Sequence, residues 1–203
     1  LIASGGGTKV PGSLTATDVS VSISVLDDGT VLNVGNNSFG NTGTNFTMTG
    51  TSKYINGGNS TKPDASGTYS LSAASTIEFM GTSATILRVG VPTTNYGYII
   101  VSGSNVSLSS PTASIKMQSG TTFTVTGTGI FNVENDIGFT GGAVTAVSST
   151  NNPTIVLQAG STINYNGLAQ PITPRNDYKN LAISGTGAKT ASGVFTVAET
   201  FTR

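Results

Sequence analysis

Few side chains in this chain are suited to catalysis. Cysteine and histidine are both absent, which excludes thiolate nucleophiles, disulfides, Cys/His zinc sites and the base of a Ser-His-Asp triad. Cleavage of a glycosidic bond needs two carboxylates that converge on one sugar, whereas the nine acidic residues here are dispersed along the sequence. We therefore predict that the protein is not an enzyme.

One short segment carries enough oxygen ligands to suggest a cation. Asn132, Glu134 and Asp136 follow one another at alternate positions, and such side chains are ligands that Ca²⁺ accepts. The segment lacks the fixed spacing and the glycine of a known calcium loop, so a solvated loop is the favoured interpretation. We predict no other cofactor.

Aromatic residues are the other candidates for a binding role. Tyr96, Tyr98 and Tyr178 could form a platform on which a sugar ring stacks. Tyrosine is also common in β-strands, so the simpler interpretation is that these side chains belong to strands.

Charge excludes two classes of partner. Nine basic residues balance nine acidic ones, giving a formal net charge of zero, and they are scattered singly rather than gathered in a cationic stripe. Nucleic acid is therefore a poor partner. No apolar run approaches the length of a membrane-spanning helix, so we do not expect insertion into a membrane.

The pattern of apolar residues is that of β-strands. Only 9% of the residues are charged, and apolar residues alternate with Ser and Thr, as in residues 19–25, which predicts half-buried strands. The triplet Asp27-Asp28-Gly29 then predicts a turn. Further strands are predicted around residues 46–48, 77–79, 99–101, 115–117, 123–125, 155–157, 163–165, 181–183 and 195–197.

Three segments recur later in the chain in the same order. Residues 43–51 resemble 120–128 at an offset of 77, residues 75–81 resemble 161–167 at an offset of 86, and residues 96–103 resemble 178–185 at an offset of 82. These matches predict two tandem copies, residues 1–110 with an N-terminal strand region and residues 111–203, continuous as one solenoid. Repeats that cover one another's core are typical of solenoids.

Two all-β architectures fit these observations. The first is a parallel β-solenoid, or β-helix, of tandem repeats with Gly and Asn at its corners. The second is a pair of tandem β-sandwich domains. The strands are short and closely spaced and the loops differ by single residues, which favours the solenoid.

The last fifth of the chain resembles a known family. Residues 178–193 fit the pattern Tyr-x-Asn-Leu-x-Ile-Ser-Gly-x-Gly-x-Lys-Thr-x-Ser-Gly, preceded by Asn164-Tyr165-Asn166-Gly167. This pattern is similar to one in repetitive secreted surface and adhesin proteins of the Bacteroidetes, many of them β-helical. The match covers residues 161–203 well, whereas the first copy lacks the Asn-Leu and Lys-Thr elements.

The resemblance implies a location and a role but no active site. We expect a structural or adhesive repeat module, a stalk or adhesin segment, of a secreted or cell-surface protein. A self-assembling extracellular fibre subunit and a carbohydrate-binding β-helix module are the alternatives. The expected partners are further repeats of the same parent chain or neighbouring subunits, with surface glycans as a further option. Because the alternation runs to Arg203, we expect either a continuing chain or pairing with another subunit there.

Overall fold

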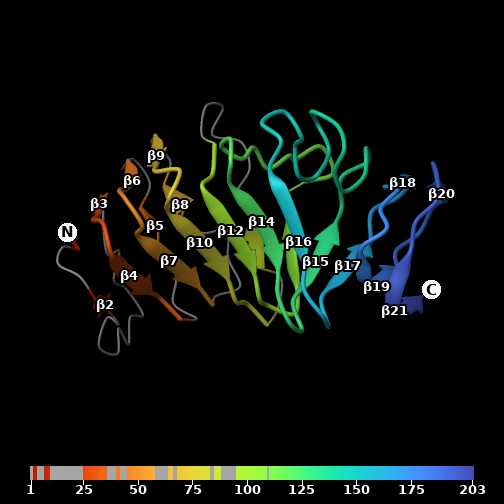
Figure 1. The fold of residues 1–203 in the computed structure, drawn as a ribbon, viewed down its shortest axis with the longest axis horizontal. Coiled ribbons are helices and arrows are strands. Elements are labelled where there is room, and N and C mark those ends of the chain that lie inside the picture. Colours follow the sequence, from red (N-terminus) through yellow and green to blue (C-terminus); the bar gives the residue numbers. More distant parts are fainter. Residues whose placement is uncertain are drawn as a thin grey trace.

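The protein is an all-β solenoid. The computed structural model describes residues 2–3, 7–9, 25–35, 40–41, 45–57, 64–65, 68–82, 85–87, 95–108 and 110–203. Within these ranges there is no helix, and every paired strand runs parallel to its neighbour. Successive turns lie side by side along the long axis, so the chain colours change steadily from one end of the molecule to the other (Figure 1).

Three main sheets form the faces of the coil. The four-stranded sheet contains β1 (Ile2–Ala3), β3 (Val25–Leu26), β6 (Phe46–Met48) and β9 (Tyr69–Leu71). The seven-stranded sheet contains β2 (Gly7–Lys9), β4 (Thr30–Asn33), β7 (Lys53–Asn56), β10 (Thr76–Phe79), β12 (Tyr98–Val101), β14 (Thr122–Val125) and β16 (Thr154–Leu157). The six-stranded sheet contains β11 (Thr85–Leu87), β13 (Val106–Leu108), β15 (Ile130–Val133), β17 (Thr162–Tyr165), β19 (Tyr178–Ile183) and β21 (Val197–Thr202).

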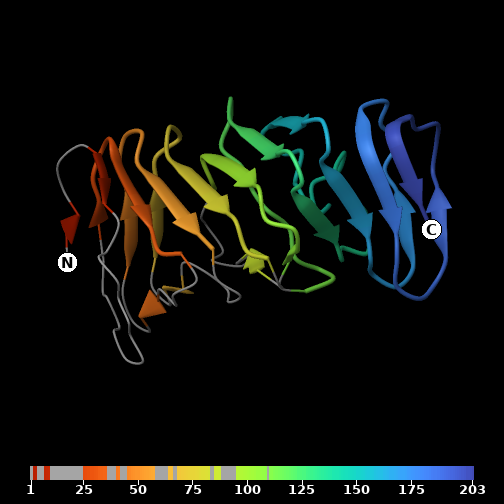
Figure 2. The same cartoon turned by 90° about the horizontal axis from the view of Figure 1, so that it is seen from below.

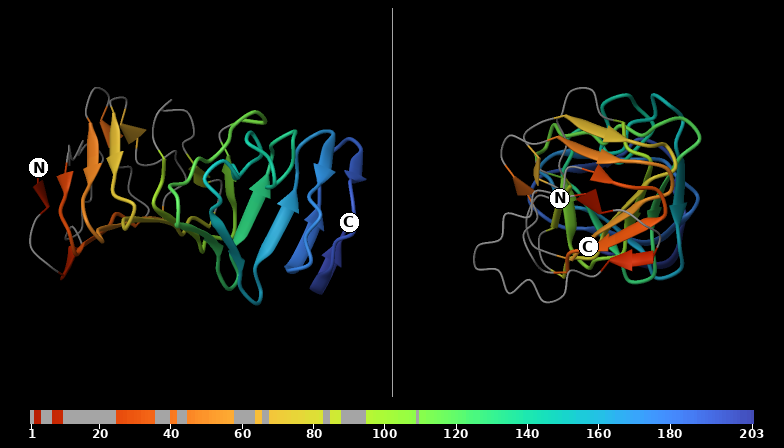
Figure 3. Two further views of the ribbon diagram at one scale, coloured as in Figure 1. Left: turned by 45° about the horizontal axis from the view of Figure 1, so that its top comes forward. Right: turned by 90° about the vertical axis from the view of Figure 1, so that its left-hand side faces the viewer.

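Two short pairs complete the strands of the described residues. These are β5 (Gly40–Asn41) with β8 (Asp64–Ala65), and β18 (Gln170–Ile172) with β20 (Lys189–Ala191). Figure 2 shows the strands following one another along the long axis, and the end-on view in Figure 3 shows the turns wound around that axis.

The length of one turn changes along the coil. Thr76 pairs with Lys53 at a sequence offset of 23 and with Tyr98 at an offset of 22. Phe123 pairs with Ile155 at an offset of 32, because this turn, the long turn, carries an additional loop. Near the C-terminus Ile163 pairs with Leu181 at an offset of only 18, so the turns there are tighter.

Alternating side chains fill the interior. In β10 and β14 the apolar side chains are buried and the intervening residues are partly exposed, which is the outcome expected for a strand with one face on a core. At the centre, the Phe123 and Phe131 rings meet edge to face with centroids 5.1 Å apart, and Phe139 packs on both. Burying each such ring contributes about 1.5–3 kcal/mol.

Tight corners set the path between the faces. At the start of several strands, the N–H of a Ser or Thr bonds to the carbonyl three residues back, as in Thr30 to Asp27, Ser52 to Thr49 and Ser75 to Ser72. These corner hydroxyl residues are buried. Gly29 adopts a φ of 69° at one such corner, a conformation that glycine takes at little steric cost.

The structure confirms the parallel β-solenoid, and the sandwich alternative is wrong. The turn at Asp27-Asp28-Gly29 is confirmed, and most predicted strand centres fall in strands. Residues 115–117 form only isolated bridges, and β21 begins at Val197 rather than before it. The predicted strand over residues 19–25 lies outside the described residues except for Val25.

The recurring segments do not occupy equivalent positions. Residues 46–48 lie in the four-stranded sheet and residues 123–125 in the seven-stranded sheet. Likewise, residues 77–79 and 99–101 lie in the seven-stranded sheet, whereas 163–165 and 181–183 lie in the six-stranded sheet. The two-copy division at residue 110 stays a prediction, and strand pairing continues across it from β12 to β14 and from β13 to β15.

Candidate functional site

Long polar side chains clamp several turns to earlier ones. Gln118 donates from Nε2 to the carbonyl oxygens of Leu71, at 2.7 Å, and Asn95, at 3.0 Å. Gln170 donates in the same way to Val133, at 2.6 Å, and Asn135, at 2.9 Å. Leu71 and Val133 are the last residues of β9 and β15, and buried carbonyls without a partner are costly. These inter-turn clamps satisfy them.

The Lys-Thr element of the C-terminal pattern supplies a third clamp. Lys189 Nζ donates to the carbonyl oxygens of Gly167, at 2.7 Å, and Leu168, at 2.6 Å. Desolvation lowers the pKa of this ammonium group. Gly187, with a φ of 100°, passes so close to Leu168 that a Cβ would lie 2.7 Å from the Leu168 carbonyl carbon. The pattern thus brings backbone of one turn directly onto the previous turn.

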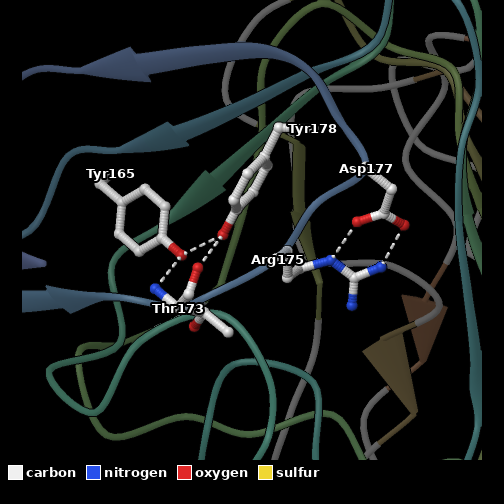
Figure 4. A network of polar contacts seen from close by, with 5 residues as sticks. All are labelled: Tyr165, Thr173, Arg175, Asp177 and Tyr178. Carbon is white, nitrogen blue, oxygen red and sulfur yellow. Dashed lines mark hydrogen bonds and ion pairs between the residues drawn. The ribbon is translucent and has the colours of Figure 1, made fainter. Parts of the chain in front are cut away.

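The tyrosines of the same pattern form a buried polar network (Figure 4). The hydroxyls of Tyr165 and Tyr178 lie 2.9 Å apart, and Tyr178 donates to the carbonyl of Thr173 at 2.9 Å. The N–H of Thr173 donates to the Tyr165 hydroxyl at 3.0 Å. Burial raises the pKa of both phenols, so they stay neutral and serve as hydrogen-bonding groups.

An ion pair flanks this network. Arg175 makes two bonds to Asp177, at 2.8 Å and 2.5 Å, and its guanidinium carbon lies 5.8 Å from the centroid of the Phe139 ring. Phe139 belongs to the additional loop of the long turn, and Arg175 to the next turn. The contact therefore joins consecutive turns, as the clamps do.

A ladder of amides runs along the six-stranded sheet. Asn132 Nδ2 donates to Asn105 Oδ1 and to the Ser107 hydroxyl, while Asn132 Oδ1 accepts a bond of 2.8 Å from Asn164. Ser184 continues the ladder by donating to Asn164 Oδ1 at 2.9 Å. Asn132 is only 5% exposed, so its amide bonds to neighbouring turns rather than to solvent.

The suggested calcium ligands lie in and just after β15. Asn132 has both its amide groups engaged in the ladder, and Asp136 is exposed beyond the end of β15. Its backbone N–H bonds to Pro111. Among the described residues no group of three His, Cys, Asp or Glu side chains is placed to hold a metal ion. Calcium binding by Asn132, Glu134 and Asp136 stays a prediction without added support.

The three suggested sugar contacts have separate environments. Tyr178 is fully buried, so no sugar ring can stack on it in this conformation. Tyr96 is partly buried and packs against the core. Tyr98 is different, because it is 38% exposed on the outer face of β12. Of the three, Tyr98 is the most exposed, and glycan contact stays a prediction.

Sequence reasoning missed the clamps because their residue types are ordinary. Gln118 and Gln170 are single polar residues near corners and carry no motif of their own. Lys189 belongs to the sequence pattern that carries the family resemblance, so of the three clamp residues it alone lies in a recognisable motif. For Gln118 and Gln170, the sequence offers only a weak indication: each is a polar residue with a long side chain, placed about one turn after a corner.

No protein-family model matches the chain, and no curated protein or solved structure is significantly similar to it. Across the described ranges, the structure has no helix that is long and apolar enough to span a membrane.

Proposed function

We propose that this chain is a stiff structural segment, a stalk or adhesin repeat, of a secreted or cell-surface protein. The observation that carries the proposal is the repeated clamping of one turn onto another by Gln118, Gln170 and Lys189. Such contacts add to the strand ladders and resist separation of the turns along the axis. Each turn contacts chiefly its neighbours, which is how solenoids build length.

The surface chemistry supports the same role. The chain has no net charge and few charged residues, but many hydroxyl and amide side chains. These groups keep an extended surface hydrated without attracting polyanions. The resemblance of residues 161–203 to Bacteroidetes surface proteins supports the extracellular location.

Single-molecule pulling tests the mechanical role. The chain is held at both ends between reference domains and stretched. Release of one turn, such as that from Thr76 to Tyr98, should lengthen the molecule by roughly 70 Å, given about 3.5 Å per extended residue less one strand spacing. We expect stepwise release in increments of this size. Smooth extension at low force, like that of an unfolded chain, would contradict the proposal.

The self-assembling fibre is the main alternative and makes a different prediction. It predicts ordered filaments from the purified chain. Light scattering after size exclusion, with negative-stain images, separates the two, since a stalk segment should give a particle near 20.4 kDa. For the location, antibody labelling of intact, unpermeabilised source cells should be positive, and labelling only after permeabilisation would contradict it.

A further inference from the structure

The outer face of the seven-stranded sheet carries a column of hydroxyl side chains around one exposed ring. Thr76 and Tyr98 are paired in register, and Tyr98 lies beside Thr122, one position before the Ile99–Phe123 pair. Thr122 in turn pairs with Thr154. All four side chains point outward, since Ile77, Ile99 and Phe123 beside them fill the core (this set of outward residues is the Tyr98 column).

The face around this column has no net charge. In the described strands from β4 to β16 its only charged residues are Lys53 and Glu78, which form an ion pair of 2.6 Å. Glu78 also accepts a bond of 2.6 Å from the Ser102 hydroxyl, and its side chain is 14% exposed. Both charges are thus matched within the sheet. These strands offer neither a free cation for an anionic ligand nor a free anion for a cationic one.

The spacing of the column suits a linear ligand. Neighbouring strands lie about 4.8 Å apart, so the outward groups recur along the solenoid axis at close to the length of one sugar ring. An aromatic ring presents an apolar surface to the C–H face of a sugar and leaves its rim polar. The threonine hydroxyls on either side can both donate and accept hydrogen bonds.

We propose that the Tyr98 column binds a neutral, linear polysaccharide lying along the solenoid axis. One sugar ring stacks on Tyr98, and the hydroxyl groups of the flanking sugars bond to Thr76 and Thr122. This inference goes beyond the structural role and does not depend on it. Of the three tyrosines that the sequence suggested as a sugar-binding platform, the proposal uses only Tyr98. Ile100 and Val156 also point outward on this face, but the hydroxyl groups of Thr76 and Thr122 lie on the strands directly beside the ring and favour a sugar over a protein partner.

The test is affinity electrophoresis in gels that contain hydroxyethylcellulose, mixed-linkage β-glucan or, as an anionic comparison, polygalacturonate. We expect the wild-type chain to be retarded by at least one neutral polysaccharide. Tyr98→Ala should weaken binding roughly tenfold, the loss expected for one aromatic contact, while Tyr98→Trp should retain it. Val144→Ala is the matched control, since Val144 is an exposed apolar residue on a different part of the coil.

Each other outcome overturns the proposal. These outcomes are no retardation by either neutral polysaccharide, equal retardation of Tyr98→Ala and wild type, and retardation by polygalacturonate alone. A wild-type dimer that Tyr98→Ala converts to monomer would assign the face to self-association instead. Circular dichroism confirms that each variant is folded, and the pulling experiment is unaffected by any of these results.

Discussion

Removing one buried hydroxyl should loosen the C-terminal turns measurably. In Tyr178→Phe the ring remains but its hydroxyl is lost, which leaves the carbonyl of Thr173 and the hydroxyl of Tyr165 without their bonds of 2.9 Å. A buried polar group deprived of its partner costs about 1–3 kcal/mol. Since two groups are affected and can relax partly, we expect a loss of about 2–3 kcal/mol in the local free energy of opening.

Hydrogen exchange is the assay, because it reports opening turn by turn rather than for the whole chain. The amides of Asn180 and Ser184, which bond to the previous turn, should exchange roughly 30- to 150-fold faster, since about 1.4 kcal/mol is tenfold. Tyr98→Phe is the control, because that hydroxyl belongs to an exposed residue. Equal exchange at these amides in the two variants would refute the reasoning.

A second substitution checks the cause. If the cost arises partly from the stranded hydroxyl of Tyr165, then adding Tyr165→Phe to Tyr178→Phe should cost less than Tyr165→Phe costs alone. Non-additivity of this kind is expected for residues in one hydrogen-bond network. Strict additivity of the two losses would mean that the hydroxyls act independently.

Three further predictions concern the clamps and corners. Lys189→Met should speed exchange in the last turns by roughly tenfold, since it removes two bonds to carbonyls; unchanged exchange would contradict the clamp. Gly50→Ala should lower the melting temperature more than Gly120→Ala, because both have positive φ but only at Gly50 would a Cβ collide with the side chain of Asp28; equal shifts would contradict this. Bonds from the backbone and side chain of Thr51 lower the pKa of Asp28 below 3.8. Its stabilisation should therefore be complete above about pH 4 and disappear as the pH falls through the folded-state pKa. Asp28→Asn should remove that part of the acid sensitivity, and an unaltered stability profile would contradict it.

The strands and the fold class could be predicted from the sequence because the pattern is local. Alternation in residues 123–125 places Phe123 and Val125 inside wherever the strand lies. The face that a strand occupies could not be predicted in the same way. Strands of all three main sheets bury alternate residues, so Phe46 and Phe123 look equivalent in the sequence although they lie in different sheets.

The length of one turn can be recognised in the sequence from the Ser and Thr residues at the corners. Thr30, Ser52 and Ser75 recur at sequence offsets of 22 and 23, each closing a tight turn at the start of a strand. The spacing of these hydroxyl residues equals the length of one turn. The longer recurring segments, in contrast, have offsets of 77 to 86 residues, which span several turns. The candidate site was less predictable. Tyr98 is exposed and Tyr178 is buried. This difference depends on which turn covers each ring, and the sequence does not specify that.

The most direct test of the account measures the stacking distance itself. The chain has no cysteine, so Val31→Cys and Thr154→Cys introduce two unique sites for spin labels on the outer face of the seven-stranded sheet. Five strand spacings separate them in register, which gives roughly 24 Å. A stiff stack predicts a narrow distance distribution near that value in double electron–electron resonance. A broad distribution, or a mean roughly twice as long, would contradict a rigid solenoid.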